Sequence, residues 1–171
     1  QRQMCIRDSW KTMGCLFPGR CCCWAMAAQQ RAGSQLTVAC REGSLPKAQA
    51  MVEDLARYAA DLGDNHFAAR VVTYAQLEQE QRRYQLALNA TSVGMLPHAG
   101  VSPVPQEVVA RCGAVFDAVY NPGETELLRL AKQAGAVVVG GMEMLVYQAV
   151  AAHEIWYGGQ FSPQDLADLC A

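Results

Sequence analysis

The spacing of apolar residues changes repeatedly along this chain, and these changes predict alternating strands and helices. Apolar residues recur three or four positions apart from Lys47 to Leu62 and from Met144 to Tyr157, so both segments are predicted helices. Thr125 is a suitable cap for another helix, which Gly135 would end. Short runs rich in apolar and β-branched residues are predicted strands, at 35–40, 67–74, 86–90, 114–120 and 136–139.

The remaining segments connect these elements. Residues 76–83 are polar and helix-like, 102–113 combine a loop with a short helical piece, and Pro163 opens a last short helix. Strands that alternate with helices predict an α/β fold with a mostly parallel sheet and helices on both faces. In such a sheet ligands bind beyond the carboxyl ends of the strands, so the residues that follow each strand are the functional candidates.

The composition narrows the class of protein. The 171 residues are enough for one domain with its own core, 51% of them are hydrophobic, and the formal net charge is −2. No basic stripe points to nucleic acid, and no apolar run approaches the ~20 residues that cross a bilayer. Since no apolar segment is typical of a secretion signal, we expect a cytoplasmic protein with neither a nucleic-acid nor a membrane partner.

The eight cysteines do not form a metal-binding pattern. Five of them stand in the first 23 residues, three in a row, and no Cys-x-x-Cys pair exists. The three histidines are isolated from the cysteines. The sequence therefore predicts no metal site.

Two loops that follow predicted strands contain the strongest candidate motifs. One is Asn89-Ala90-Thr91-Ser92-Val93-Gly94-Met95, a small, hydroxyl-rich turn in which Gly94 permits a backbone conformation closed to other residues. The other is Gly140-Gly141-Met142-Glu143-Met144-Leu145-Val146-Tyr147-Gln148, where two glycines let a ligand approach the backbone closely. Gln148 stands four residues after Met144, so both lie on one face of the predicted helix.

Together with Tyr120-Asn121-Pro122 after the fourth strand, these motifs resemble the C-terminal, cofactor-binding half of shikimate dehydrogenase over roughly residues 35 to 170. The resemblance implies a Rossmann-like domain over 34–171, with the C-terminal family segment at about 139–170. It implies NADP as the cofactor and NADPH-dependent reduction of 3-dehydroshikimate to shikimate, in aromatic amino-acid (chorismate) biosynthesis. The implied partner is a small-molecule substrate, and the full-length enzyme can be a homodimer.

The resemblance also implies which residues bind the cofactor. They belong to the loops after three strands: Arg41, Asn89, Thr91, Ser92, Gly94, Met95, Gly141 and Met144. Arg41 matches the arginine that contacts the adenosine 2′-phosphate, for which a guanidinium is well suited. Its neighbours Cys40 and Glu42 depart from the Asn-Arg-Thr of the family, which weakens the expected preference for NADP.

On the substrate side, the resemblance assigns Tyr120 to the mouth of the shikimate pocket and Gln148 to the substrate hydroxyls, which an amide can both donate to and accept from. Trp156 and Tyr157 fit the aromatic ending of the family and are expected in the core. No residue here matches the lysine and aspartate pair that handles the proton. In the family this pair belongs to an N-terminal substrate domain, so we expect this chain to be inactive by itself.

Residues 1–33 do not share the resemblance, and the glycine loop expected before Gln35 to cradle the pyrophosphate is absent. Read two nucleotides later, the codons of Cys21 to Ala27 give Leu-Leu-Leu-Gly, an ambiguous residue and a second Gly, which is an apolar strand entering a glycine loop. We therefore predict that this anomalous head is out of frame or disordered, and that the first strand and its loop are missing or corrupted. A first residue Gln1 fits a truncated reading frame.

Two alternatives remain open. Quinate dehydrogenases share these motifs, and the residues that separate quinate from shikimate lie mostly in the N-terminal domain. The chain can also be a non-catalytic α/β module that binds a partner, which predicts no saturable binding of NADPH.

Overall fold

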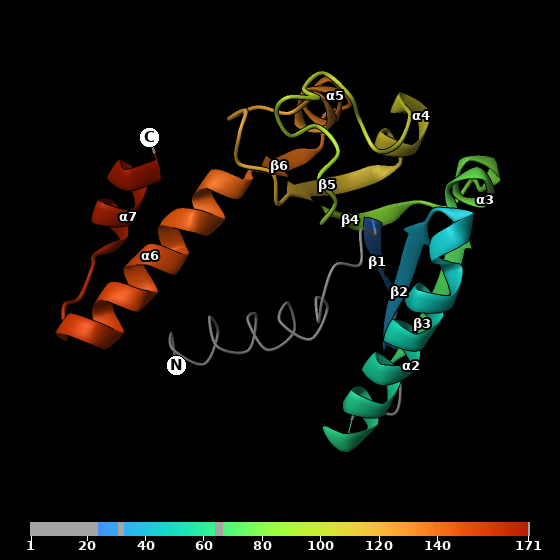
Figure 1. The fold of residues 1–171 in the computed structure, drawn as a ribbon, viewed down its shortest axis with the longest axis horizontal. Helices are drawn as coiled ribbons and strands as arrows, with labels where there is room; N and C mark the ends of the chain where they lie inside the picture. The colour runs from blue at the N-terminus through green and yellow to red at the C-terminus, as the bar shows by residue number, and fades with distance from the viewer. Residues whose placement is uncertain (1–23, 31–32, 64–66, 171) are drawn as a thin grey trace.

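The computed structural model describes residues 24–30, 33–63 and 67–170, and its centre is a six-stranded sheet with the order β3-β2-β1-β4-β5-β6 (Figure 1). The pairs β2–β3, β4–β5 and β5–β6 are parallel, as the sequence predicts. All five predicted strands are present, with bounds shifted by a few residues at most. The strands are β1 (Trp24–Gln30), β2 (Gly33–Cys40), β3 (Ala68–Thr73), β4 (Tyr84–Asn89), β5 (Cys112–Asp117) and β6 (Val137–Val139).

Helices connect the parallel strands. Thr125 caps α5, since its hydroxyl accepts a hydrogen bond from the Leu128 amide at 3.3 Å, and Gly158 ends α6 in the left-handed region at φ 69°. The segment predicted at 76–83 is the shorter α3, which begins earlier because Thr73 and Gln76 form a capping box. The helices are η1 (Glu42–Ser44), α2 (Leu45–Asp61), α3 (Tyr74–Gln79), α4 (Gln106–Val109), α5 (Glu126–Gln133), α6 (Gly141–Tyr157) and α7 (Pro163–Cys170).

The strand β1 departs from two expectations, that the sheet is mostly parallel and that its first strand is missing or corrupted. It lies between β2 and β4 and runs antiparallel to both. Only two residues separate β1 from β2, and so short a connection joins antiparallel neighbours, whereas a parallel pair needs a crossover of about a dozen residues. Residues 24–30 of the predicted anomalous head therefore form a central strand, while residues 1–23 lie outside the described residues.

The position of β1 aligns the strands on either side of it. Because β1 is antiparallel to both neighbours, β2 and β4 run in the same direction. Trp24 is the pairing partner of Ala39 on one side and of Asn89 on the other. The carboxyl ends of β2 and β4 therefore lie at the same edge of the sheet, at the same level, with the beginning of β1 between them.

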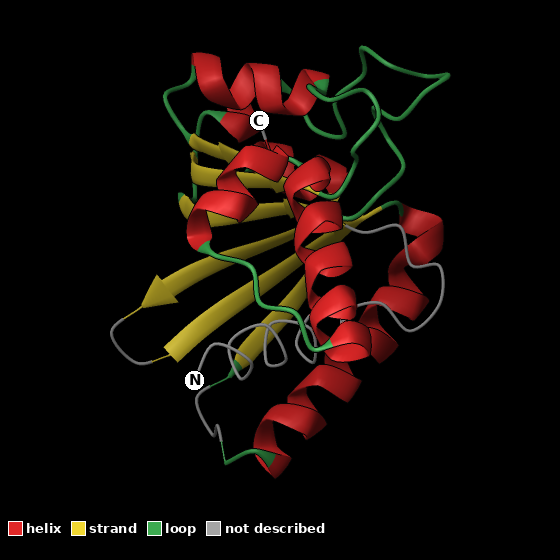
Figure 2. Cartoon of the chain, turned by 90° about the vertical axis from the view of Figure 1, so that its left-hand side faces the viewer, coloured by secondary structure: helices red, strands yellow, loops and turns green. Residues whose placement is uncertain are grey.

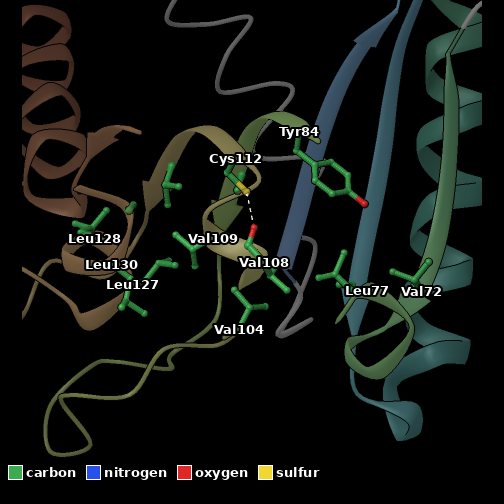
Figure 3. Packing of buried hydrophobic residues seen from close by; sticks show 14 residues of the cluster. Val72, Leu77, Tyr84, Val104, Val108, Val109, Cys112, Leu127, Leu128 and Leu130 are labelled. Carbon is green, nitrogen blue, oxygen red and sulfur yellow. Dashed lines mark hydrogen bonds between the residues drawn. The ribbon is translucent and has the colours of Figure 1, made fainter. Parts of the chain in front are cut away.

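Helices cover both faces of the sheet, as expected (Figure 2). Side chains alternate between the faces, so Val38 and Cys40 pack beneath α2 while Ala39 belongs to the larger core on the other face. Figure 3 shows this larger core, in which side chains of α3, α4 and α5 pack against strands. Its fully buried members include Leu77, Val109 and Leu127.

The last two helices differ from the rest. α6 leaves the sheet at Gly141 and extends away from it, and α7 packs beside α6 (Figure 1). Trp156 and Tyr157 are each 74% exposed, so the prediction that they lie in the core is wrong. They stand at the end of α6 that is distant from the sheet (Figure 1). None of the helices in the described part of the chain is both long and apolar enough to cross a membrane.

Candidate functional site

The loops after β4, β5 and β6 are joined by backbone hydrogen bonds at the carboxyl edge of the sheet. The amide of Ala118 donates to the carbonyl of Asn89 at 2.9 Å, and the amide of Leu96 donates to the carbonyl of Asn121 at 3.2 Å. At the start of α6, the amide of Gly141 donates to the carbonyl of Val119 at 3.3 Å. The three motifs predicted from the sequence therefore meet at one place.

The turn after β4 is held by buried side chains. Asn89 is fully buried and Thr91 is 6% exposed. The Asn89 Oδ1 atom accepts from the Thr91 amide at 3.0 Å and from the Thr91 hydroxyl at 2.8 Å, and the Val93 amide donates to that hydroxyl at 3.1 Å. Asn89 and Thr91 thus determine the shape of the loop from inside.

Asp117 is a buried member of this site that the sequence analysis did not identify. It is the last residue of β5, pairs with Asn89 across the sheet and is fully buried. Its carboxylate accepts from the Asn89 side-chain amide at 2.9 Å, from the Val119 amide at 3.0 Å and from the Thr125 hydroxyl at 2.6 Å. The available signal was an acidic residue at the end of an otherwise apolar strand, directly before the Tyr120 motif.

Burial sets the proton affinity of this carboxyl group. It raises the pKa of Asp117 above its ordinary value of 3.8, while the hydrogen bonds from Thr125, Val119 and Asn89 act in the opposite direction. None of the salt bridges among the described residues includes Asp117. The carboxylate is therefore stabilised by neutral donors alone.

Two glycines allow the loops to approach one another. Gly94 has φ 91°, the left-handed region, and a Cβ there would lie 3.1 Å from the Val101 carbonyl oxygen. At Gly141 a Cβ would lie 2.4 Å from the carbonyl oxygen of Ala118, which is closer than real Cβ atoms approach. Both positions predicted from the motifs thus require glycine.

The predicted residues that reach solvent line the outside of the same loops. Ser92 is exposed, Met95 is 43% exposed and Tyr120 is 47% exposed. Met144 and Gln148 are half-buried and stand one turn apart on α6. Since a helix rises about 1.5 Å per residue, Gln148 lies roughly 10 Å along α6 from Gly141, away from the sheet.

Arg41 lies at the same edge but two strands away from Asn89. It is exposed, and its carbonyl accepts from the Ser44 amide at 2.8 Å. With β1 between β2 and β4, the ends of those strands are about 10 Å apart. Among the described residues this interval is occupied by the beginning of β1, which contains no glycine, and not by a loop that enters a helix.

Two hollows lie elsewhere on the described surface. One, of about 150 Å³, is lined by residues of β2 and β3, including Thr37 and Arg70, and the other, of about 360 Å³, includes Arg83 and Arg111. No predicted site residue lines either one. In the described part of the chain, no three His, Cys, Asp or Glu side chains gather as a metal site would require.

No protein-family model matches the chain. The shikimate dehydrogenase (NADP(+)) of Caldanaerobacter subterraneus subsp. tengcongensis is 41% identical over 90 residues, 52% of this chain and 32% of the relative. That of Nitrosopumilus maritimus is 35% identical over 131 residues, 77% of this chain and 44% of the relative. The chain thus spans less than half the length of these curated relatives.

Solved structures are similar over most of the chain. A shikimate dehydrogenase in complex with NADP+ has a TM-score of 0.55 at 29% identity, and covers 73% of this chain and 42% of its own. The quinate dehydrogenase from Corynebacterium glutamicum in complex with NAD has a TM-score of 0.61 at 26% identity, and covers 78% of this chain and 44% of its own. In sequence and in its Rossmann-like α/β fold, this chain is a relative of the shikimate dehydrogenases over part of their length.

Proposed function

We propose that this chain is the cofactor-binding part of an NADP-dependent shikimate dehydrogenase, which reduces 3-dehydroshikimate to shikimate with NADPH in chorismate and aromatic amino-acid biosynthesis. The observation that carries the proposal is the meeting of three loops at the carboxyl edge, where ligands of such sheets bind. The motifs of residues 89–95, 120–122 and 140–148 all stand on these loops. The curated relatives are named for this activity.

The reaction transfers a hydride from NADPH to a carbonyl carbon while a proton is delivered to the oxygen. This chain supplies the cofactor side of that reaction. We assign the ribose and nicotinamide to the loop of residues 89–95, with Ser92 and Met95 as its exposed members. Gly94 and Gly141 let the backbones come close, and Met144 flanks them at the start of α6.

The substrate side is assigned to two residues. Tyr120 follows β5 and is half-exposed beside the cofactor loop, and Gln148 lies on α6 with an amide that can both donate to and accept from hydroxyl groups. The proton donor is expected outside this chain, in a lysine and aspartate pair of an N-terminal domain. The chain alone should therefore give no NADP-linked oxidation of shikimate, and robust turnover would contradict this part of the proposal.

Arg41 is the proposed determinant of the preference for NADP. Its guanidinium is exposed at the edge where the adenosine 2′-phosphate would lie. Arg41→Gln should lower the affinity for NADPH about tenfold, as the loss of one or two charge-assisted hydrogen bonds implies, and leave the affinity for NADH unchanged. Fluorescence titration measures both affinities. Arg83→Gln, an exposed arginine outside the site, is the matched control.

Two other readings give different results in the same experiments. A quinate dehydrogenase is favoured by the similarity to the Corynebacterium enzyme, and the complete gene product would then oxidise quinate faster than shikimate. A non-catalytic binding module would show no saturable binding of NADPH. We also propose cytoplasmic localisation and a homodimer for the full-length enzyme, by the same resemblance.

The proposal includes the domain division. We propose that residues 34–171 belong to the cofactor domain and that residues 1–33 are read from the wrong frame, although residues 24–30 form a strand of the same sheet. The strand β1, which has no glycine, runs through the segment whose shifted codons encode a glycine loop. Sequencing the source DNA across codons 1 to 40 tests this division. A confirmed frame would remove the explanation for the missing pyrophosphate loop.

A further inference from the structure

We infer that Asp117 is a positioning residue, whose carboxylate joins the cofactor loop of residues 89–95, the Tyr120 loop and the start of α5 into one unit. The inference rests on the proposed function for the identity of the ligand. It goes beyond that function because Asp117 reaches no ligand itself. It is fully buried and acts through its neighbours.

The three donors to Asp117 come from three separate segments of the chain. Oδ1 accepts from the Asn89 side chain at the end of β4 and from the Val119 amide in the loop after β5. Oδ2 accepts from the Thr125 hydroxyl at the start of α5, which in turn accepts from the Leu128 amide. One carboxylate therefore sets the relative position of two loops and a helix.

Further contacts close a ring around the cofactor loop. From Asn89 the hydrogen bonds continue through Thr91 to the Val93 amide, next to Gly94. A Cβ on Gly94 would lie 3.6 Å from the Cβ of Thr125, so the loop packs back against the residue that donates to Asp117. A change at Asp117 should thus alter the conformation at both ends of the cofactor loop.

Stability alone does not account for a carboxylate at this position. Burial of an unpaired charge opposes folding, and burial raises the pKa of Asp117 accordingly. All three partners are donors, however, and only a group that accepts with both oxygens satisfies them together. In Asp117→Asn one acceptor becomes a donor that faces either Thr125 or the pair formed by Asn89 and Val119.

The test compares Asp117→Asn with Thr37→Val in the full chain. Thr37 is 2% exposed and accepts from Arg70 outside the site, so its variant removes a part-buried hydrogen bond from a buried residue. Asp117→Asn should weaken NADPH binding about tenfold and also lower the urea midpoint, because a buried donor then faces another donor. Thr37→Val should lower the midpoint and leave NADPH binding unchanged. Thr125→Ser keeps the hydroxyl and should retain affinity, whereas Thr125→Val should lose it.

Hydrogen exchange supplies a readout that needs no ligand. In Asp117→Asn the amides of Thr91, Val93 and Val119 should all exchange several-fold faster, since they lie on both loops of the proposed unit. If the unaltered chain binds no NADPH, the proposed function fails and exchange still decides the role of Asp117. Unchanged exchange at the three amides, or unchanged affinity in a chain that binds NADPH, would overturn the inference.

Discussion

Two polar clusters in this molecule use a carboxylate in opposite ways. The amino-side cluster contains Arg70, Glu80, Tyr84 and Thr37, and the carboxyl-edge cluster contains Asp117 with Asn89, Thr91 and Thr125. Glu80 is paired with the Arg70 guanidinium through two hydrogen bonds of 2.6 Å. Asp117 has no cation beside it among the described residues.

The two environments move the proton affinity in opposite directions. The hydrogen bond from Arg70 is the main cause that lowers the pKa of Glu80, whereas burial is the main cause that raises the pKa of Asp117. The first carboxylate supports the fold and remains partly in water, with 24% of its side chain exposed. The second opposes folding through its burial, and it stands at the edge where we propose that the cofactor binds. Such a local conflict with stability is expected where function fixes a residue.

The largest expected effect is at Gly141, where the carboxyl edge has no spare volume. In Gly141→Ala the new methyl would lie 2.4 Å from the Ala118 carbonyl oxygen, and backbone cannot yield as a flexible side chain can. We expect the free energy of unfolding to fall by about 3 kcal/mol, or α6 to be displaced. Urea titration followed by circular dichroism measures the free energy of unfolding.

Gly123→Ala is the matched control for Gly141→Ala. Gly123 stands on the loop after β5, has no positive φ, and a Cβ there meets nothing within 4 Å. The free energy of unfolding of Gly123→Ala should differ from that of the unaltered chain by less than about 0.5 kcal/mol. An equal change in the free energy of unfolding for both alanine variants would show that the carboxyl edge is no more tightly packed than the surface.

The next largest effect is expected at the amino-side cluster, where a substitution should lower the free energy of unfolding without changing the affinity for NADPH. Arg70→Met removes both hydrogen bonds to Glu80 and the bonds to Thr37 and Tyr84. It leaves Glu80 with the Tyr84 hydroxyl at 2.9 Å. Because the pair is partly exposed, we expect a loss of only about 1 kcal/mol in the free energy of unfolding. Affinity for NADPH should not change.

A surface ion pair provides the control for Arg70→Met. Arg57 pairs with Asp54 on α2, and both side chains are mostly exposed. Arg57→Met should leave the urea midpoint within error of the unaltered chain, as isolated surface pairs usually do. Loss of NADPH binding in Arg70→Met would mean that the two clusters are not independent.

The comparison also shows what the sequence could predict. Periodicity located α2 because one face of that helix packs on the sheet, and the Thr125 cap was confirmed because its hydroxyl accepts from the helix. The candidate loops were placed correctly at one edge, since parallel strands all end there. Gly94 was expected in a conformation closed to other residues and has φ 91°.

Other features depend on contacts that no local pattern encodes. A lone Asp117 at the end of a strand resembles any turn residue, and its importance arises only when Asn89 and Thr125 come to lie beside it. The antiparallel β1 follows from its short connection to β2 and not from the composition of either strand. Trp156 is exposed because α6 leaves the sheet, which the period of α6 does not reveal.

The smallest effect, and the sharpest test of the comparison, is the pH dependence of stability. Glu80 has a lowered pKa, so its contribution to the free energy of unfolding is present above the ordinary value of 4.5 and is lost as the pH falls through the folded-state pKa. Asp117 has a raised pKa, so its contribution is largest below 3.8 and declines as the pH rises through the folded-state pKa.

Urea titrations between pH 3 and pH 7 of the unaltered chain, Glu80→Gln and Asp117→Asn measure both contributions. The difference in unfolding free energy between the unaltered chain and Glu80→Gln should grow as the pH rises through the acid range. The difference from Asp117→Asn should shrink over the same range, because the folded chain binds that proton more tightly than the unfolded chain. If both differences grew as the pH rises, the Asp117 carboxylate would stabilise the fold as the Glu80 carboxylate does, and the contrast between the clusters would then disappear.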